Sequence, residues 1–123
     1  LGIEKNVIFT GFLSGEEIAH AYSSADLYIM PSISEPFGIT PLEAIKHGTP
    51  VLISKQSWVS EVIKNALRVD FWDIEEMASQ TLAVLEYSPL KKTLKNFSQT
   101  EVKNLQWKKQ AKKITEIYNK ALP

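Results

Sequence analysis

The sequence contains no cysteine, and histidine occurs only at positions 20 and 47. Disulfide bonds and catalytic thiolates are therefore excluded, and a metal site built from histidines is not expected. No apolar run approaches the roughly 20 residues of a membrane-spanning helix, and the chain starts with neither a signal peptide nor a methionine. We therefore expect the 123 residues to form one cytoplasmic domain that is part of a longer protein.

Positive charge is scarce in most of the chain and concentrated at its end. Residues 1–90 hold five basic and twelve acidic residues, a net charge of −7, whereas residues 91–123 hold nine lysines and two glutamates, a net charge of +7. Solvated helix surfaces are the first explanation of this lysine-rich helical end at residues 90–123. A second explanation is peripheral contact with an acidic membrane surface, which attracts clustered lysines. Nucleic-acid binding is not expected, because few aromatic residues lie among the lysines and no recognition motif is present.

Short apolar runs alternate with helical patterns in the first part of the chain. Strands alternating with helices indicate a parallel sheet. We therefore predict an α/β domain with a parallel sheet of about four strands, helices on both faces and two C-terminal helices. The predicted strands lie at residues 6–10, 27–30, 50–54 and 66–69. The predicted helices lie at residues 14–23, 41–46, 57–63, 73–87, 90–103 and 107–121.

Residues that can cap helices mark three of the predicted helix starts. Ser14 with Glu17, and Asp73 with Glu76, have the spacing of a capping box. Ser57 is a third candidate cap. In the helix that begins at Asp73, apolar residues predict which side faces the core: Met77, Leu82, Leu85 and Tyr87.

Residues 31–44 connect the predicted strand 27–30 to a helix that begins near Pro41. A glycine-containing loop before a helix presents free backbone N–H groups to a ligand. Glu35 lies in this loop, and Thr40 and Glu43 are three residues apart, hence on one face of the helix. Either glutamate alone is explained by a stabilisation of the helix dipole of about 0.3–1 kcal/mol. Together they suggest more: Thr40 can supply a hydroxyl beside a phosphate, and Glu43 can accept the paired hydroxyls of a ribose.

Three loops follow predicted strands, at residues 10–11, 31–38 and 54–58. Ligands of parallel α/β sheets bind at the carboxyl ends of the strands. We therefore expect these loops to meet at one edge of the sheet and to line one crevice.

Glu35 and Glu43, with Pro-Phe-Gly-Ile-Thr-Pro-Leu between them, resemble the E-x7-E motif of retaining glycosyltransferases of the GT-B type, family 4 (group 1). The flanking residues 25–32 and 43–51 are similar to that family as well. The resemblance covers most of the chain and implies the later part of the C-terminal, donor-binding domain. The implied activity of the intact protein is the transfer of a sugar from a nucleotide-diphosphate sugar to an acceptor.

The resemblance also implies roles for individual residues. Glu35 would have the catalytic position and contact the donor sugar near its reacting carbon, while Glu43 would bind the ribose hydroxyls. The backbone at Phe37, Gly38 and Ile39 would approach the sugar and the diphosphate. Thr40 would contact the distal phosphate, and Gly11 and Trp58 would lie nearby. The family implies no cofactor and no metal ion.

The chain departs from the family pattern in three respects. The basic Arg/Lys pair that neutralises the diphosphate is absent, and so is the N-terminal domain that holds the acceptor. The loop after the third predicted strand reads Gln-Ser-Trp-Val-Ser at residues 56–60, where the family commonly has paired glycines. Trp58 could belong to the core or cover the site, and Glu61 could serve its helix or a ligand.

These departures predict weak donor binding and no turnover by this chain alone. In the family's strand order, two further strands separate the predicted strand 6–10 from the strand 27–30. Open sheet edges would then favour self-association. Two other functions stay open: a nucleotide-sugar epimerase, and a non-catalytic nucleotide-binding or assembly module of the same fold.

Overall fold

The computed structural model describes residues 1–105 and 107–121. Its centre is a parallel sheet of three strands in the order β1-β2-β3, and these strands are Tyr28–Met30, Val51–Ser54 and Leu67–Val69. Tyr28 is paired with Val51, and Leu52 is paired in turn with Leu67. Helix α2 (Thr40–Lys46) connects β1 to β2, and α3 (Val59–Val62) connects β2 to β3. The predicted α/β class and its parallel sheet are therefore confirmed, with three strands instead of four.

The middle strand, β2, lies at the centre of the hydrophobic core. All four of its residues are buried, as expected for a strand with a neighbour on each side and helices packed on it. Helix α2 packs on β1 and β2 through Ala44 and Ile45, which are fully buried. The connected core consists of Met30, Ala44, Ile45, Val51, Ile53, Val59 and Ile63.

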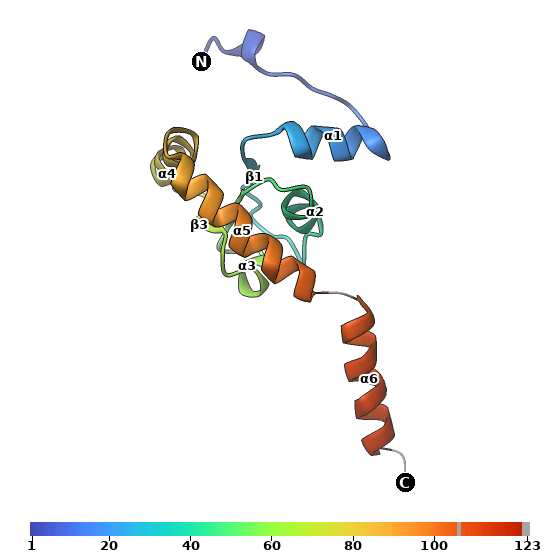
Figure 1. The fold of residues 1–123 in the computed structure, drawn as a ribbon. Coiled ribbons are helices and arrows are strands. Elements are labelled where there is room, and N and C mark those ends of the chain that lie inside the picture. The colour runs from blue at the N-terminus through green and yellow to red at the C-terminus, as the bar shows by residue number, and fades with distance from the viewer. Residues whose placement is uncertain (106, 122–123) are drawn as a thin grey trace.

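Two long helices complete the packed body, α4 (Ile74–Glu86) and α5 (Ser88–Asn104). Helix α5 packs against both α2 and α4 and lies across the body in Figure 1. The carboxylate of Glu101 on α5 accepts hydrogen bonds from the backbone N–H groups of Lys64 (3.2 Å) and Asn65 (2.9 Å). A further ion pair joins Lys91 on α5 to Asp26, just before β1. These contacts attach α5 to the segments that precede the two edge strands of the sheet, β1 and β3.

The prediction of a strand at residues 6–10 is wrong. A short 3₁₀ helix (Glu4–Asn6) is followed by an extended segment whose Ile8 and Phe9 side chains are 85% and 94% exposed. Figure 1 shows this segment running apart from the sheet, beyond α1 (Glu16–Ser24). A strand exists only when a neighbouring strand accepts its backbone hydrogen bonds, and within the described residues the sheet stops at β1.

Two predicted caps take other forms, and one is confirmed. Helix α1 has Gly15, not Ser14, as its N-cap. One of the two hydrogen bonds of the predicted capping box is present, because the Ser14 N–H donates to Glu17 Oε2 at 3.2 Å. Ser57 does not cap α3, because its hydroxyl donates to the carbonyl of Ser54 at 2.7 Å. Asp73 caps α4 as predicted, accepting from the Glu76 N–H at 3.0 Å.

The predicted core side of α4 is wrong for every residue except Met77. Leu82, Leu85 and Tyr87 are exposed, and Val84 is the buried residue of the helix. The face turned inward contains Met77 and Thr81 beside Val84. The Thr81 hydroxyl donates to the Met77 carbonyl at 2.7 Å, so this polar side chain can be partly buried at little cost.

Helix α6 (Trp107–Ala121) extends away from the body in Figure 1 and has no buried residue. Its bounds agree with the predicted last helix. Among the described residues, no helix combines the length and the apolar character that crossing a membrane requires.

Candidate functional site

The loop between β1 and α2 is shaped around Gly38. Gly38 has a φ of +70°, and a Cβ at this position would lie 2.9 Å from Glu35 Cγ and 3.3 Å from Met30 Cε. The side chain of Glu35 is therefore folded back over the glycine. Any other residue at position 38 would have two effects: it would strain the backbone, and its Cβ would displace the Glu35 side chain.

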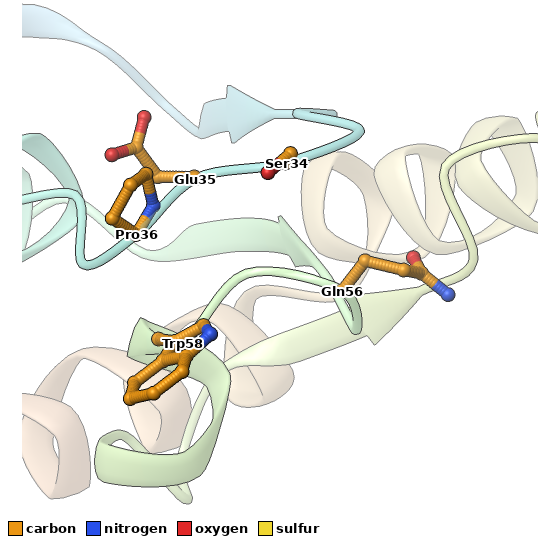
Figure 2. A pocket seen from close by; sticks show the side chains of 5 residues that line it. All are labelled: Ser34, Glu35, Pro36, Gln56 and Trp58. Carbon is orange, nitrogen blue, oxygen red and sulfur yellow. The ribbon is translucent and has the colours of Figure 1, made fainter.

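Glu35 is also tied to the loop that follows β2. Glu35 and Ser57 form an isolated parallel bridge, and the Trp58 N–H donates to the Glu35 carbonyl at 3.3 Å. The loops 31–38 and 54–58, which the sequence places at one edge of the sheet, do meet. Between them lies a hollow of about 300 Å³, called here the Glu35 hollow and lined by Ser34, Glu35, Pro36, Gln56 and Trp58. Figure 2 shows the Glu35 carboxylate pointing away from Gln56 and Trp58, toward the other side of its loop.

Gln56 is held firmly by groups at the ends of β2 and β3. Its Nε2 donates to Asp70 Oδ1 at 2.8 Å, and its Oε1 accepts from Ser54 Oγ at 2.8 Å. Lys55 Nζ lies 2.8 Å from the other oxygen of Asp70. The hydrogen bond from Lys55, followed by that from Gln56, lowers the pKa of the Asp70 carboxyl below its ordinary value. The Gln56 wall of the Glu35 hollow is thus fixed by hydrogen bonds to Ser54 and Asp70. The local sequence around Gln56 did not predict the contact with Asp70.

Glu43 lines a second hollow of about 300 Å³, called here the Glu43 hollow. Thr40 shares this hollow with Glu43, as expected for residues three apart on a helix. Gly11, predicted to lie nearby, is also part of it. The predicted single crevice is therefore divided: the loop at residues 10–11 meets Glu43, and the loop at 54–58 meets Glu35. The lining residues of the Glu43 hollow are Thr10, Gly11, Leu13, Ile18, Ala21, Tyr22, Thr40 and Glu43.

Polar groups at the Glu43 hollow are already oriented. The Tyr28 hydroxyl donates to Thr40 Oγ1 at 2.9 Å, and Thr40 in turn lies 3.8 Å from Met30 Sδ, a weak acceptor. The ring of Tyr22 meets that of Tyr28 edge-on at 5.6 Å. Burial raises the pKa of the Tyr22 hydroxyl, and the neighbouring Tyr28 and the Glu43 carboxylate raise it further. Tyr22 therefore stays protonated beside Glu43 and is available as a donor.

The remaining predicted site residues are exposed. Phe37 and Ile39 flank Gly38 with their side chains toward solvent, so only their backbone is in a position to approach a ligand. Trp58 is 66% exposed and does not belong to the core. Sequence reasoning overlooked two residues of these hollows. One is Tyr22, and the other is Gln56, whose partner Asp70 follows another strand. Among the described residues, no group of three or more His, Cys, Asp or Glu could hold a metal ion.

The fold defines a class of protein: a parallel α/β domain in which the loops after β1 and β2 meet around a hollow. A family model described as glycosyl transferases group 1 matches residues 1–114. The chain belongs to this family, and its fold is that of GT-B glycosyltransferases.

Individual relatives agree with the family assignment. An uncharacterized glycosyltransferase of Methanocaldococcus jannaschii is 45% identical over 65 residues, which are 53% of this chain and 17% of that protein. The structure of sucrose-phosphate synthase from Thermosynechococcus elongatus superposes with a TM-score of 0.84 at 27% identity, covering 97% of this chain and 31% of the synthase. The C-terminal domain of a glycosyl transferase group 1 family protein from Francisella tularensis has a TM-score of 0.74 at 25% identity, covering 84% of this chain and 55% of that domain. The chain thus spans less than a third of the relatives from the first two organisms.

Proposed function

We propose that this chain is the donor-binding part of a retaining glycosyltransferase of family 4, which transfers a sugar from a nucleotide-diphosphate sugar to an acceptor. The observation that carries this proposal is the loop around Gly38. It combines the positive φ of Gly38, the folded side chain of Glu35 and the hydrogen bond that ties Glu35 to the loop after β2. Such a loop brings backbone and carboxylate close to one ligand.

Glu43 and Thr40 have the chemistry to hold the nucleotide. The Glu43 carboxylate, at the Glu43 hollow with a protonated Tyr22 as neighbour, can accept the two hydroxyls of a ribose. Thr40 Oγ1 accepts from Tyr28 and keeps its own proton for an anionic oxygen, because a sulfur is its present acceptor. The backbone N–H groups of Thr40 and Leu42, at the start of α2, have no partner within the helix and can donate to the same phosphate. Pro41, which lies between them, has no N–H.

Glu35 is assigned to the donor sugar. Its carboxyl carbon lies beside Gly38, and a sugar attached to a phosphate near Thr40 would come within its reach. In the intact enzyme the leaving diphosphate would be stabilised by these donors and by groups outside this chain. The acceptor would be held by the N-terminal domain.

The chain alone is expected to bind donor weakly and to show no turnover. A micromolar affinity requires about −8.2 kcal/mol. Hydrogen bonds to charged groups contribute about 1.5–3 kcal/mol each, and the ordering of the ligand offsets several kcal/mol of their sum. Submicromolar binding of a UDP- or GDP-sugar in calorimetry would contradict this estimate.

The proposal is tested by following the backbone amides of the ¹⁵N-labelled chain by NMR. Addition of UDP, GDP and their sugar conjugates is expected to shift the amide signals of Gly11 and of the residues in 35–43 other than the prolines 36 and 41, which have no N–H. Glu43→Ala should weaken this binding at least ~10-fold, because a charged hydrogen-bond acceptor is lost. Glu86→Ala, at an exposed position of α4, is the matched control and should bind as the wild type does.

Two results would refute the proposal. One is the absence of amide shifts at any nucleotide concentration. The other is unchanged binding by Glu43→Ala together with impaired folding or association, which is the behaviour expected of a non-catalytic assembly module.

A further inference from the structure

Trp58 is a large aromatic side chain that the fold does not need. It is 66% exposed, while the residues on either side of it, Ser57 and Val59, are buried. The backbone at residue 58 has φ −63° and ψ −27°, which any L-amino acid adopts. Neither packing nor backbone geometry therefore calls for tryptophan at this position.

The position of Trp58 relative to Glu35 is fixed by the backbone. The Trp58 N–H donates to the Glu35 carbonyl at 3.3 Å, and the adjacent residue, Ser57, forms the bridge to Glu35. Ser57 is itself held by its hydroxyl bond to the Ser54 carbonyl. The side chain at position 58 is consequently held beside the loop of Glu35, as Figure 2 shows.

The other walls of the Glu35 hollow are polar or small. Gln56 is immobilised by Ser54 and Asp70, and Ser34 adds a hydroxyl on the opposite loop. Pro36 is the one further apolar wall. A hollow of about 300 Å³ is at the lower end of the range of small-molecule sites. One exposed aromatic face, with the Ser34 hydroxyl and the Gln56 amide on the neighbouring walls, suits a ligand with an apolar face and a polar rim.

We propose that the Glu35 hollow is a sugar subsite in which the indole of Trp58 stacks on the C–H face of a pyranose ring. The hydroxyls of the ring would face Ser34 and the polar edge of the hollow. A lipid chain fits less well, because it offers no partner to the polar walls and would leave them desolvated. The proposal rests on the proposed function for the source of the ring, which is either the sugar of the donor or a sugar of the acceptor.

The first experiment uses a variant in which Trp58 is the only tryptophan, so that tryptophan fluorescence reports on this residue alone. The chain contains three tryptophans, so Trp72→Phe combined with Trp107→Phe leaves Trp58 alone. This variant is titrated with methyl glycosides of glucose, galactose and mannose, and with UDP-glucose and GDP-mannose. We expect a saturable change in Trp58 emission with at least one pyranoside or nucleotide sugar. No saturable change with any of them would overturn the proposal.

The second experiment compares affinities among variants, measured by NMR. Trp58→Ala is expected to weaken sugar binding about 2- to 10-fold, the range of aromatic stacking contributions, and Trp58→Phe should retain part of it. Trp72→Phe, at a tryptophan that is 61% exposed but outside the hollow, should have no effect. Equal affinities of Trp58→Ala and the wild type would overturn the proposal.

Matched ligands identify the source of the ring. A loss of affinity for UDP-glucose without a loss for UDP assigns the subsite to the donor sugar. A loss for a methyl glycoside in the presence of saturating nucleoside diphosphate assigns it to the acceptor. The two proposals fail separately: absence of nucleotide binding by the wild type refutes the proposed function, whereas the response of Trp58 to glycosides remains measurable.

Discussion

Gly38 shows how one residue controls the geometry of a whole loop. Its positive φ turns the chain from β1 toward α2, and the space where a Cβ would stand is taken by Glu35 Cγ. The local pattern of residues 35–43 predicted a glycine loop. It could not predict that the side chain of Glu35 would lie against Gly38, in the space that a Cβ at position 38 would need.

Substitution of Gly38 is therefore expected to harm stability and binding together. Gly38→Ala should cost about 1–2 kcal/mol for the left-handed backbone and additionally displace Glu35. Gly15→Ala is the control, since Gly15 also has a positive φ but a Cβ there meets nothing within 4 Å. Urea unfolding should show a larger loss for Gly38→Ala, and nucleotide-sugar binding should weaken for this variant alone. Equal losses of stability would show that the contact with Glu35 is unimportant.

The Lys55–Asp70 ion pair predicts a definite pH dependence. The pair lowers the pKa of Asp70 and raises the pKa of Lys55. The stabilisation that comes from Asp70 is present above the pKa of the unfolded carboxyl and is lost as the pH falls through the lowered pKa. That from Lys55 is present below the ordinary lysine pKa and is lost as the pH rises through the raised value. Both are retained between about pH 4 and pH 10.

The pH dependence can be tested on Asp70 itself. Lys55→Met should raise the pKa of the Asp70 carboxyl toward its ordinary value, because the largest cause of its lowering is removed. Carboxyl ¹³C NMR titration measures this directly. Lys64→Met, at an exposed lysine of another loop, serves as control. An unchanged pKa of Asp70 in Lys55→Met would exclude the ion pair as the cause.

Among the helices, α4 shows what local sequence patterns can and cannot predict. Its start at Asp73 was predictable, because capping depends on residues three apart. Its buried face was not, because Leu82 and Leu85 are as apolar as Val84 and only the position of β3 and α5 decides which side is covered. Thr81 could join the buried side since its hydroxyl bonds within the helix.

The Asp73 cap should contribute measurably to stability. Asp73→Ala is expected to lower the free energy of unfolding by about 1 kcal/mol, because the Glu76 N–H loses its acceptor. Asp73→Ser retains a capping oxygen and should remain close to the wild type in urea unfolding. If both variants unfold at the wild-type urea concentration, the cap does not stabilise α4.

Over the whole molecule, apolar side chains stay exposed at both ends of the chain. Ile8 and Phe9 lie on the extended segment before α1, and Trp107, Ile114 and Ile117 lie on α6. Figure 1 shows these two parts reaching away from the packed body in different directions. Exposed apolar surface of this kind, with an open strand edge at β1, favours association with other polypeptide.

We therefore expect self-association of this chain that depends on its first residues. Sedimentation velocity should show species larger than a monomer whose fraction grows with concentration. Ile8→Lys combined with Phe9→Lys should reduce them, whereas Glu4→Lys, which adds charge to the same segment without removing apolar surface, should do so less. A monomer at every concentration would contradict the expectation.

The sequence by itself determined the alternating α/β order, the parallel pairing of the three strands at residues 28–30, 51–54 and 67–69, and the motif around Glu35 and Glu43. These features depend on spacing and on runs of apolar residues, which are local properties. The tertiary structure alone decided that Glu35 and Glu43 line separate hollows, that Trp58 stands exposed beside Glu35, and that residues 6–10 form no strand. The physical reason is that burial and strand pairing depend on neighbours distant in sequence, and no property of a segment specifies which neighbours cover it.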